Sequence, residues 1–117
     1  MPLQSIAMTD RPVLIMVTAG GRDEAERIGE GLVVDHIAAC TSVVPTVHSF
    51  YFQEGLLKRD HEALLLIKTV ESRVEAVQDY VRTHHSYTLP EFIKIKIDGG
   101  SPEYLRWMAE QVGEKPR

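Results

Sequence analysis

Three stretches of the chain have the hydrophobic pattern of strands in one sheet. Val13–Val17 is a continuous apolar run, typical of a central strand buried on both faces. Residues 38–52 form a second β region, in which Pro45 indicates an edge, a bulge or a bend. A turn at 53–55 and a polar stretch ending at His61 separate this region from the apolar run 63–68. We expect the second and third stretches to pair as a long hairpin.

Two amphipathic segments are predicted to be helices packed against this sheet. The first begins near Asp23, and apolar residues recur along it every three or four positions, at Ala25, Ile28, Leu32 and His36 or Val33. Gly29 and Gly31 weaken this helix by about 1 kcal/mol each relative to alanine. We therefore expect either that packing compensates or that a neighbouring backbone approaches closely there.

The second helix is predicted to follow Ser72, which forms a capping box with Glu75; Thr69 is an alternative cap. Its apolar face contains Val74, Val77, Val81 and His84.

The last third of the chain adds one strand and one helix. The stretch 92–97 begins with Phe92 and then alternates between isoleucine and lysine, so we expect a half-buried strand with Ile93, Ile95 and Ile97 on its buried face. Ser101-Pro102 is a typical helix start, a capping serine followed by proline at the first helical position. Leu105, Met108 and Val112 give the final helix its apolar stripe.

The order of elements predicts a fold of the α+β class. Two β-α-β units with right-handed crossovers that share one antiparallel sheet give a ferredoxin-like β-α-β-β-α-β sandwich, here with an added C-terminal helix. We expect a single domain at 12–112, preceded by a flexible N-terminal extension at 1–11 and followed by a tail at 113–117.

Composition and charge remove several classes of function. The 117 residues are 44% hydrophobic, and 17 acidic residues against 13 basic ones give a net charge of −4, so a nucleic-acid partner is not expected. The N-terminus lacks the apolar core of a secretory signal, and the apolar runs are too short to cross a bilayer. We expect a cytoplasmic protein that does not bind membranes.

The sequence contains no complete enzyme active site and no local metal chelate. C-x-x-C, H-x-H, H-E-x-x-H and G-x-S-x-G spacings are all missing, and Cys40 is the single cysteine. A buried, structural thiol is the expected role of Cys40, and a helix C-terminus explains the pair His84-His85. His36, His48 and His61 are expected to be surface or hydrogen-bonded residues. A cysteine-dependent enzyme is the least supported of the functional hypotheses.

Several separate segments nevertheless occur in the order of one family. They are Leu32-Val33, Ile37-Ala38-Ala39-Cys40, Ser49 with Tyr51, Glu54-Gly55, the run 64–69, His85 with Tyr87, Pro90-Glu91 and Tyr104-Leu105-Arg106-Trp107. This succession resembles the CutA family of divalent-cation tolerance proteins. The resemblance implies a ferredoxin-like protomer in a homotrimer similar to PII signalling proteins, with the long hairpin reaching across to neighbouring subunits.

The resemblance also implies candidate site residues. It places Tyr51, Lys68, Tyr87, Glu91 and Trp107 in an intersubunit cleft, although interface packing explains the same residues equally well. The chain departs from the family at Ala19, Gln53, Ser86 and Thr88, where relatives have a cysteine, an aromatic residue, a proline and a carboxylate. These departures leave Cys40 and His85 as the positions for a metal ligand.

Two functions follow from the resemblance. The first is a trimeric cytosolic protein of the response to divalent metals, which binds copper or zinc weakly through Cys40 and His85 and requires no cofactor. The alternative is a PII-like sensor or scaffold, whose intersubunit cleft takes a small anionic ligand or a loop of a partner protein.

Overall fold

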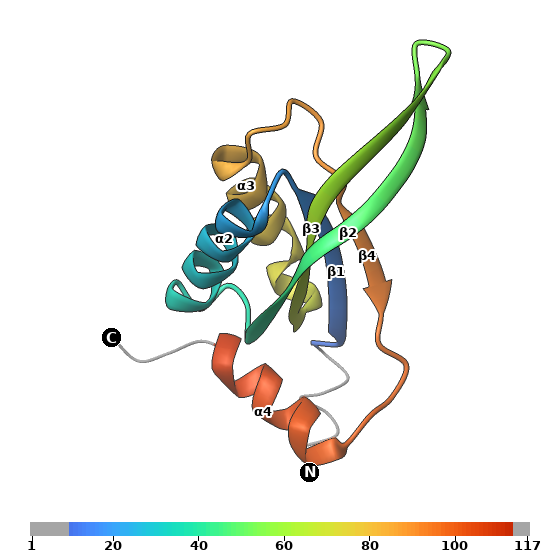
Figure 1. Cartoon of the computed structure of the whole chain (residues 1–117). Helices are drawn as coiled ribbons and strands as arrows, with labels where there is room; N and C mark the ends of the chain where they lie inside the picture. Colours follow the sequence, from blue (N-terminus) through green and yellow to red (C-terminus); the bar gives the residue numbers. More distant parts are fainter. Residues whose placement is uncertain (1–9, 114–117) are drawn as a thin grey trace.

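The computed structural model describes residues 10–113, which form a four-stranded antiparallel sheet with two helices on one face (Figure 1). The strand order is β2-β3-β1-β4. The elements are β1 (Pro12–Ala19), α2 (Arg22–Val34), β2 (Cys40–Gln53), β3 (Leu56–Val70), the 3-10 turn η1 (Glu71–Arg73), α3 (Val74–His84), β4 (Ile93–Lys96) and α4 (Pro102–Val112). The predicted ferredoxin-like class is confirmed. The predicted extension and tail lie mostly outside the described residues, and their boundaries stay a prediction.

The core lies between the sheet and the helices α2 and α3. In β1 every second residue is fully buried, and Ile15 and Val17 pack with Ile28 and Leu32 of α2 and with Val77 of α3. The alternate residues of β1 are only partly buried. The strand is therefore central, as expected, but the prediction that both of its faces are buried is wrong within one protomer.

Close packing explains the two glycines inside α2. A Cβ on Gly29 would lie 2.8 Å from Thr41 Oγ1, and one on Gly31 would lie 1.8 Å from the hydroxyl of Tyr80. The side chains of β2 and α3 thus occupy the space that a methyl group would need. Of the two residues expected to end the apolar stripe, Val33 lies in the helix, which ends at Val34. His36 lies beyond the helix at a positive φ of 60° and is exposed.

The β2–β3 hairpin is longer than the sequence indicated and projects beyond the rest of the sheet (Figure 1). Glu54 and Gly55 both have positive φ and form its two-residue turn. The pairing slips between Val44 and Val47, so Pro45 marks a bulge, one of the three expected possibilities. The polar stretch before His61 was expected to separate the two strands of the hairpin. That expectation is wrong, because the stretch belongs to β3.

The predicted capping box at the second helix is also wrong. Ser72 lies in η1, and its backbone N–H and hydroxyl both donate to the Asp10 carboxylate, at 3.0 and 2.7 Å. The alternative cap is not used either, because the hydroxyl of Thr69 donates to the Ile37 carbonyl. His84 was expected on the apolar face of α3 but is exposed and stacks on Tyr80, with ring centroids 3.9 Å apart.

The sheet face opposite α2 and α3 is apolar and largely uncovered. Ile93 and Ile95 of β4 are 48% and 41% exposed and lie beside Met16 and Leu14 of β1. The expected burial of these isoleucines is therefore wrong for one protomer, although Ile97 does pack against α4.

Helix α4 closes one end of the sheet, where Met108 and Val112 pack on Val70. Its predicted cap is confirmed, since Ser101 accepts a hydrogen bond from the Tyr104 backbone.

Candidate functional site

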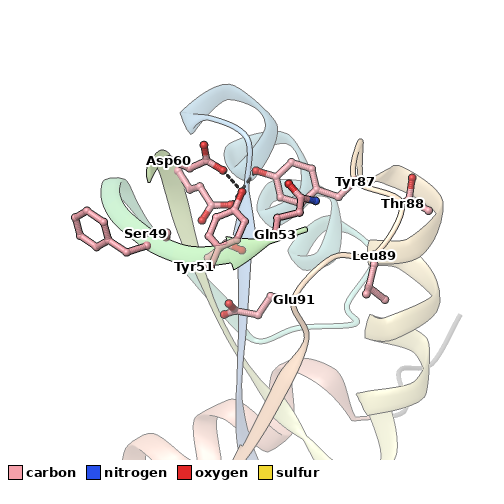
Figure 2. A pocket seen from close by; sticks show the side chains of 11 residues that line it. Ser49, Tyr51, Gln53, Asp60, Tyr87, Thr88, Leu89 and Glu91 are labelled. Carbon is pink, nitrogen blue, oxygen red and sulfur yellow. Dashed lines mark hydrogen bonds between the residues drawn. The ribbon is translucent and has the colours of Figure 1, made fainter. Parts of the chain in front are cut away.

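A cleft of about 870 Å³ lies where the hairpin leaves the sheet, beside the loop that follows α3 (Figure 2). Its walls combine aromatic rings with carboxylates. The lining residues that matter most here are Phe50 and Tyr51 from β2, Asp60 and Glu62 from β3, and Tyr87 and Glu91 from the loop. Neither lysine nor arginine lines this cleft. The protomer therefore contributes a negatively charged, aromatic half-site, which suits a cationic group better than an anion.

Each tyrosine in the cleft donates to one carboxylate. Tyr87 donates to Glu62 at 2.8 Å, and Tyr51 donates to Asp60 (Figure 2). Partial burial, the hydrogen bond to Glu62 and the surrounding negative charge raise the pKa of Tyr87 well above its usual value of 10.0. Burial, followed by the charge on Glu62, raises the pKa of Glu91. Burial is the larger cause of both shifts, and the neighbouring carboxylates add to it.

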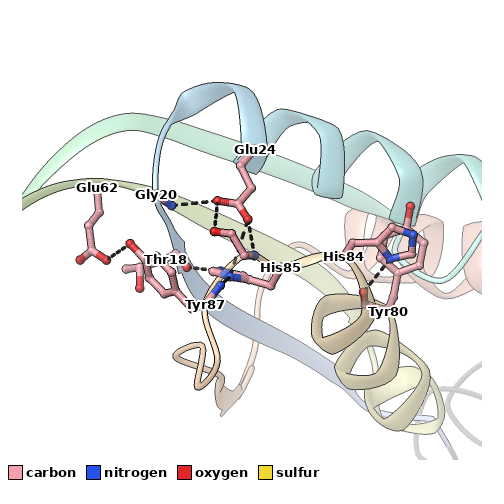
Figure 3. A network of polar contacts seen from close by, with 9 residues as sticks. Thr18, Gly20, Glu24, Glu62, Tyr80, His84, His85 and Tyr87 are labelled. Carbon is pink, nitrogen blue, oxygen red and sulfur yellow. Dashed lines mark hydrogen bonds and ion pairs between the residues drawn. The ribbon is translucent and has the colours of Figure 1, made fainter.

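A partly buried network behind the cleft holds Tyr87 in position (Figure 3). Glu24, on the first turn of α2, accepts hydrogen bonds from the backbone and hydroxyl of Ser86, at 2.7 and 3.1 Å, and from the backbone of Gly20 at 3.1 Å. Burial alone would raise the pKa of Glu24, but these donors together hold it below its ordinary 4.5. The carboxylate thus ties the loop after α3 to the N-terminus of α2.

His85, one of the two predicted metal ligands, belongs to this network. Its side chain is fully buried, and both ring nitrogens have protein partners. Nδ1 accepts from the Tyr87 backbone at 3.0 Å, so the proton is on Nε2, which donates to the Thr18 carbonyl at 2.7 Å. Within the protomer His85 therefore positions the loop, and metal coordination would require it to give up one of these bonds.

Cys40, the other predicted ligand, lies at the opposite end of the sheet. It pairs with Lys68 across β2 and β3, and the Lys68 ammonium donates to Cys40 Sγ at 3.7 Å and to Ser42 Oγ at 3.0 Å. Tyr104 of α4 lies next to Cys40, and burial, followed by the effect of this neighbour, raises the pKa of Tyr104. The structure does not bring Cys40 and His85 together.

The five predicted cleft residues also divide into two groups. Tyr51, Tyr87 and Glu91 line the cleft, whereas Lys68 lies beside Cys40 and Trp107 packs near Tyr104, with ring centroids 5.5 Å apart. The sequence analysis missed the carboxylates of Glu24, Asp60 and Glu62. The alternation of Asp60 and Glu62 along one strand face could have shown the last two.

Within residues 10–113, no group of three or more histidine, cysteine, aspartate or glutamate side chains is placed to hold a metal ion. In the same range no helix has both the length and the apolar character needed to cross a membrane.

Comparison with known proteins connects this chain and its fold to one family. Residues 13–111 match the family model described as CutA1 divalent ion tolerance protein. The chain is 42% identical over 98 residues to the CutA homolog of Xenopus laevis, covering 84% of this chain and 65% of that protein. It is 34% identical over 100 residues to the divalent-cation tolerance protein CutA of Thermus thermophilus, and the match covers 86% of this chain and 97% of that protein.

The structural comparison agrees. The crystal structure of CutA1 from Oryza sativa superposes with a TM-score of 0.85 at 34% identity and covers 89% of this chain and 95% of that one. The chain spans 58–65% of the length of the rice, Arabidopsis and Xenopus proteins that it matches. Because the family model matches nearly the whole described domain, the chain belongs to the CutA1 family of divalent ion tolerance proteins.

Proposed function

We propose that this chain acts as a homotrimer in the response to divalent cations. The names of its relatives support the second part of this proposal, because they describe those proteins as divalent-cation tolerance proteins. The observation that supports assembly best is the uncovered apolar sheet face, formed by Leu14, Met16, Leu66, Ile93 and Ile95. A contiguous apolar surface of this kind is typical of a protein–protein interface. The outer strands β2 and β4 also have one edge each without a described partner strand.

The division of the predicted cleft residues supports the same assembly. Tyr51, Tyr87 and Glu91 lie at one end of the sheet, and Lys68 and Trp107 lie at the other. A cleft made from all five residues therefore needs two protomers, with the ends of the sheet in contact.

Metal binding is the second half of the proposal. His85 is bonded to Thr18, which pairs with Leu64, whereas Cys40 pairs with Lys68. Leu64 and Lys68 are four residues apart on β3, which amounts to about 13 Å along the strand. A single metal ion lies only about 2.0–2.3 Å from each of its ligand atoms, so Cys40 and His85 of one protomer are too far apart to bind the same ion. Copper or zinc bound by Cys40 and His85 would therefore need ligands from different protomers, and we expect weak binding with no cofactor required.

Light scattering on the purified full chain tests the assembly, and a mass of about three chains is expected. Calorimetric titration with Cu(II), Zn(II) and Cd(II) tests direct binding in wild type and in Cys40→Ala. A saturable heat that Cys40→Ala loses supports the proposal. A clean monomer would overturn the assembly, and equal titrations of both proteins would remove Cys40 from the site.

A PII-like sensor is the second candidate, and the 870 Å³ cleft is the observation that favours it. The half-site of one protomer is acidic, so a small anionic ligand would need a cation such as Lys68 of a neighbouring protomer. A thermal-shift screen with nucleotides and carboxylates tests this, because a ligand stabilises the state that it binds. A flat screen counts against it.

The location of the protein and its lack of enzyme activity stay predictions. The names of two plant relatives assign those proteins to the chloroplast, and the structure of an Archaeoglobus fulgidus relative is described as periplasmic. A cytoplasmic location therefore needs its own test by fractionation in the source cell.

A further inference from the structure

Two histidines face each other across the projecting hairpin. His48 of β2 and His61 of β3 are direct partners in the antiparallel ladder, two positions beyond the bulge that follows Val44. Their ring centroids are 4.3 Å apart and the rings are tilted by 37°. Because the strands fix the two backbones, the imidazoles are held together rather than brought together by chance side-chain motion.

These rings differ from the other histidines of the described chain in their partners. His36, His84 and His85 each place a ring nitrogen against a backbone carbonyl. Within residues 10–113, His48 and His61 make no side-chain hydrogen bond, and both are exposed. Their nitrogens are therefore free to bind a ligand from solvent, and their exposure agrees with the first of the two expected alternatives, a place on the surface.

The spacing of the rings fits two ligands on adjacent positions of one metal ion. A metal–nitrogen distance of about 2.0–2.1 Å places a ring centroid about 3.2 Å from the metal. Two such rings are then about 4.5 Å apart at a ligand angle near 90° and about 5.2 Å apart at a tetrahedral angle. The observed 4.3 Å is closer to the first value. An angle near 90° is typical of square-planar Cu(II) or Ni(II), and imidazole suits both ions.

The surroundings of His61 also favour a cation. His61 borders a second pocket, of about 490 Å³, together with Asp23 and Glu24 from the first turn of α2. Arg22 lies in the same pocket but approaches Asp23 and Glu26 at 3.8 and 3.9 Å, which offsets its charge. Asp23 is 91% exposed, so its side chain is free to turn. Water or this carboxylate would complete the coordination.

We propose that His48 and His61 form a two-histidine site for a square-planar divalent ion, Cu(II) or Ni(II), on the β2–β3 hairpin. The site is separate from Cys40 and His85, and it does not depend on the proposed role in cation tolerance. It requires neither the trimer nor a thiolate, only the register of one hairpin.

Calorimetric titration of the full chain with NiCl2 tests the proposal, because Ni(II) does not oxidise the thiol of Cys40. Wild type should bind one ion per chain. His48→Gln and His61→Gln should each weaken binding by about tenfold or more, because the second ligand acts at high effective concentration. His84→Gln removes an exposed, stacked histidine from α3 and is the matched control, which should keep wild-type affinity.

Electron paramagnetic resonance of the Cu(II)-loaded chain gives a second measurement. The wild-type spectrum should show coupling to two equatorial nitrogens, and each glutamine variant should show one fewer. Circular dichroism before titration establishes that the variants are folded, as expected for two exposed positions. No saturable heat in wild type, wild-type affinity in both glutamine variants, or loss of the ion in Cys40→Ala alone would each overturn the proposal.

Discussion

The Glu24 carboxylate should contribute more to stability than any other acidic group on the first turn of α2. Its two oxygens receive three hydrogen bonds, from the Gly20 backbone and from the backbone and hydroxyl of Ser86. Glu24→Gln replaces one carboxylate oxygen by an NH2 group. This NH2 group donates hydrogen bonds and would point at the N–H or O–H group that now donates to the oxygen. A hydrogen bond to a charged group contributes about 1.5–3 kcal/mol, so we expect the free energy of unfolding to fall by that amount.

Glu26→Gln is the matched control. It removes the same charge two residues further along the same helix, but Glu26 is exposed and only approaches Arg22 at 3.9 Å. Such surface ion pairs contribute between 0 and about 1 kcal/mol. Urea unfolding at one fixed protein concentration, followed by circular dichroism, measures both variants against wild type. The concentration must be fixed because assembly would shift the apparent stability.

The effect should depend on pH with a defined sign. The folded protein holds the pKa of Glu24 below its ordinary value of 4.5, so the ionised form is favoured by folding. The stabilisation is therefore complete above about pH 4.5 and is lost as pH falls through the lower, folded pKa. The difference between Glu24→Gln and wild type should shrink on acidification. A cost within about 0.5 kcal/mol of the control at pH 7, or one that does not change with pH, would refute the role of this network.

Three further changes test other parts of the structure. Ile95→Glu places a charge on the apolar sheet face, so light scattering should show monomers; an unchanged trimer would mean that this face is not the interface. Gly31→Ala should lower the free energy of unfolding by about 1–3 kcal/mol, because the added Cβ would overlap the Tyr80 hydroxyl. Gly99 has open space around it, so Gly99→Ala should have little effect in the same urea titration. Ultraviolet titration should show one tyrosine that ionises well above the others and is missing in Tyr87→Phe; a variant that keeps this late phase would contradict the raised pKa.

The elements that form the core were predictable because their patterns are local. The spacing of Ala25, Ile28 and Leu32 placed α2 correctly, and all three are fully buried. Pro45 cannot donate to a strand ladder, which is why it predicted the irregularity that the structure has as a bulge.

Two of the errors arise from a partner that is distant in the sequence. Ser72 and Glu75 have the spacing of a capping box, but the Asp10 carboxylate, 62 residues away, takes both donors of Ser72. The polar stretch before His61 did not resemble a strand because both faces of a projecting hairpin contact water, so the hydrophobic alternation that usually marks a strand is weak. Backbone pairing with β2 makes this stretch part of a strand.

The site was predictable only in part for the same reason. The resemblance placed Tyr87 and Glu91 in a cleft between subunits, which stays a prediction; in the structure both line a cleft of one protomer. Neither could be linked by spacing to Glu62 or Glu24, because the loop after α3 meets β3 and α2 only in the folded chain. The acidic character of the cleft follows from these long-range contacts and could not be seen in the composition.

The positions of the two half-sites restrict how protomers meet in the proposed assembly. A ring can place the end with Tyr87 and Glu91 of each protomer against the end with Lys68 and Trp107 of the next. A two-fold dimer can join the same unlike ends only with its two chains antiparallel. Opposite charges meet in both arrangements, which favours contact between unlike ends over contact between two acidic ends. If this holds, Lys68→Met should weaken the assembly. The mass of the variant in light scattering should also change less with salt concentration than that of wild type, because the charge pair that salt screens is no longer present.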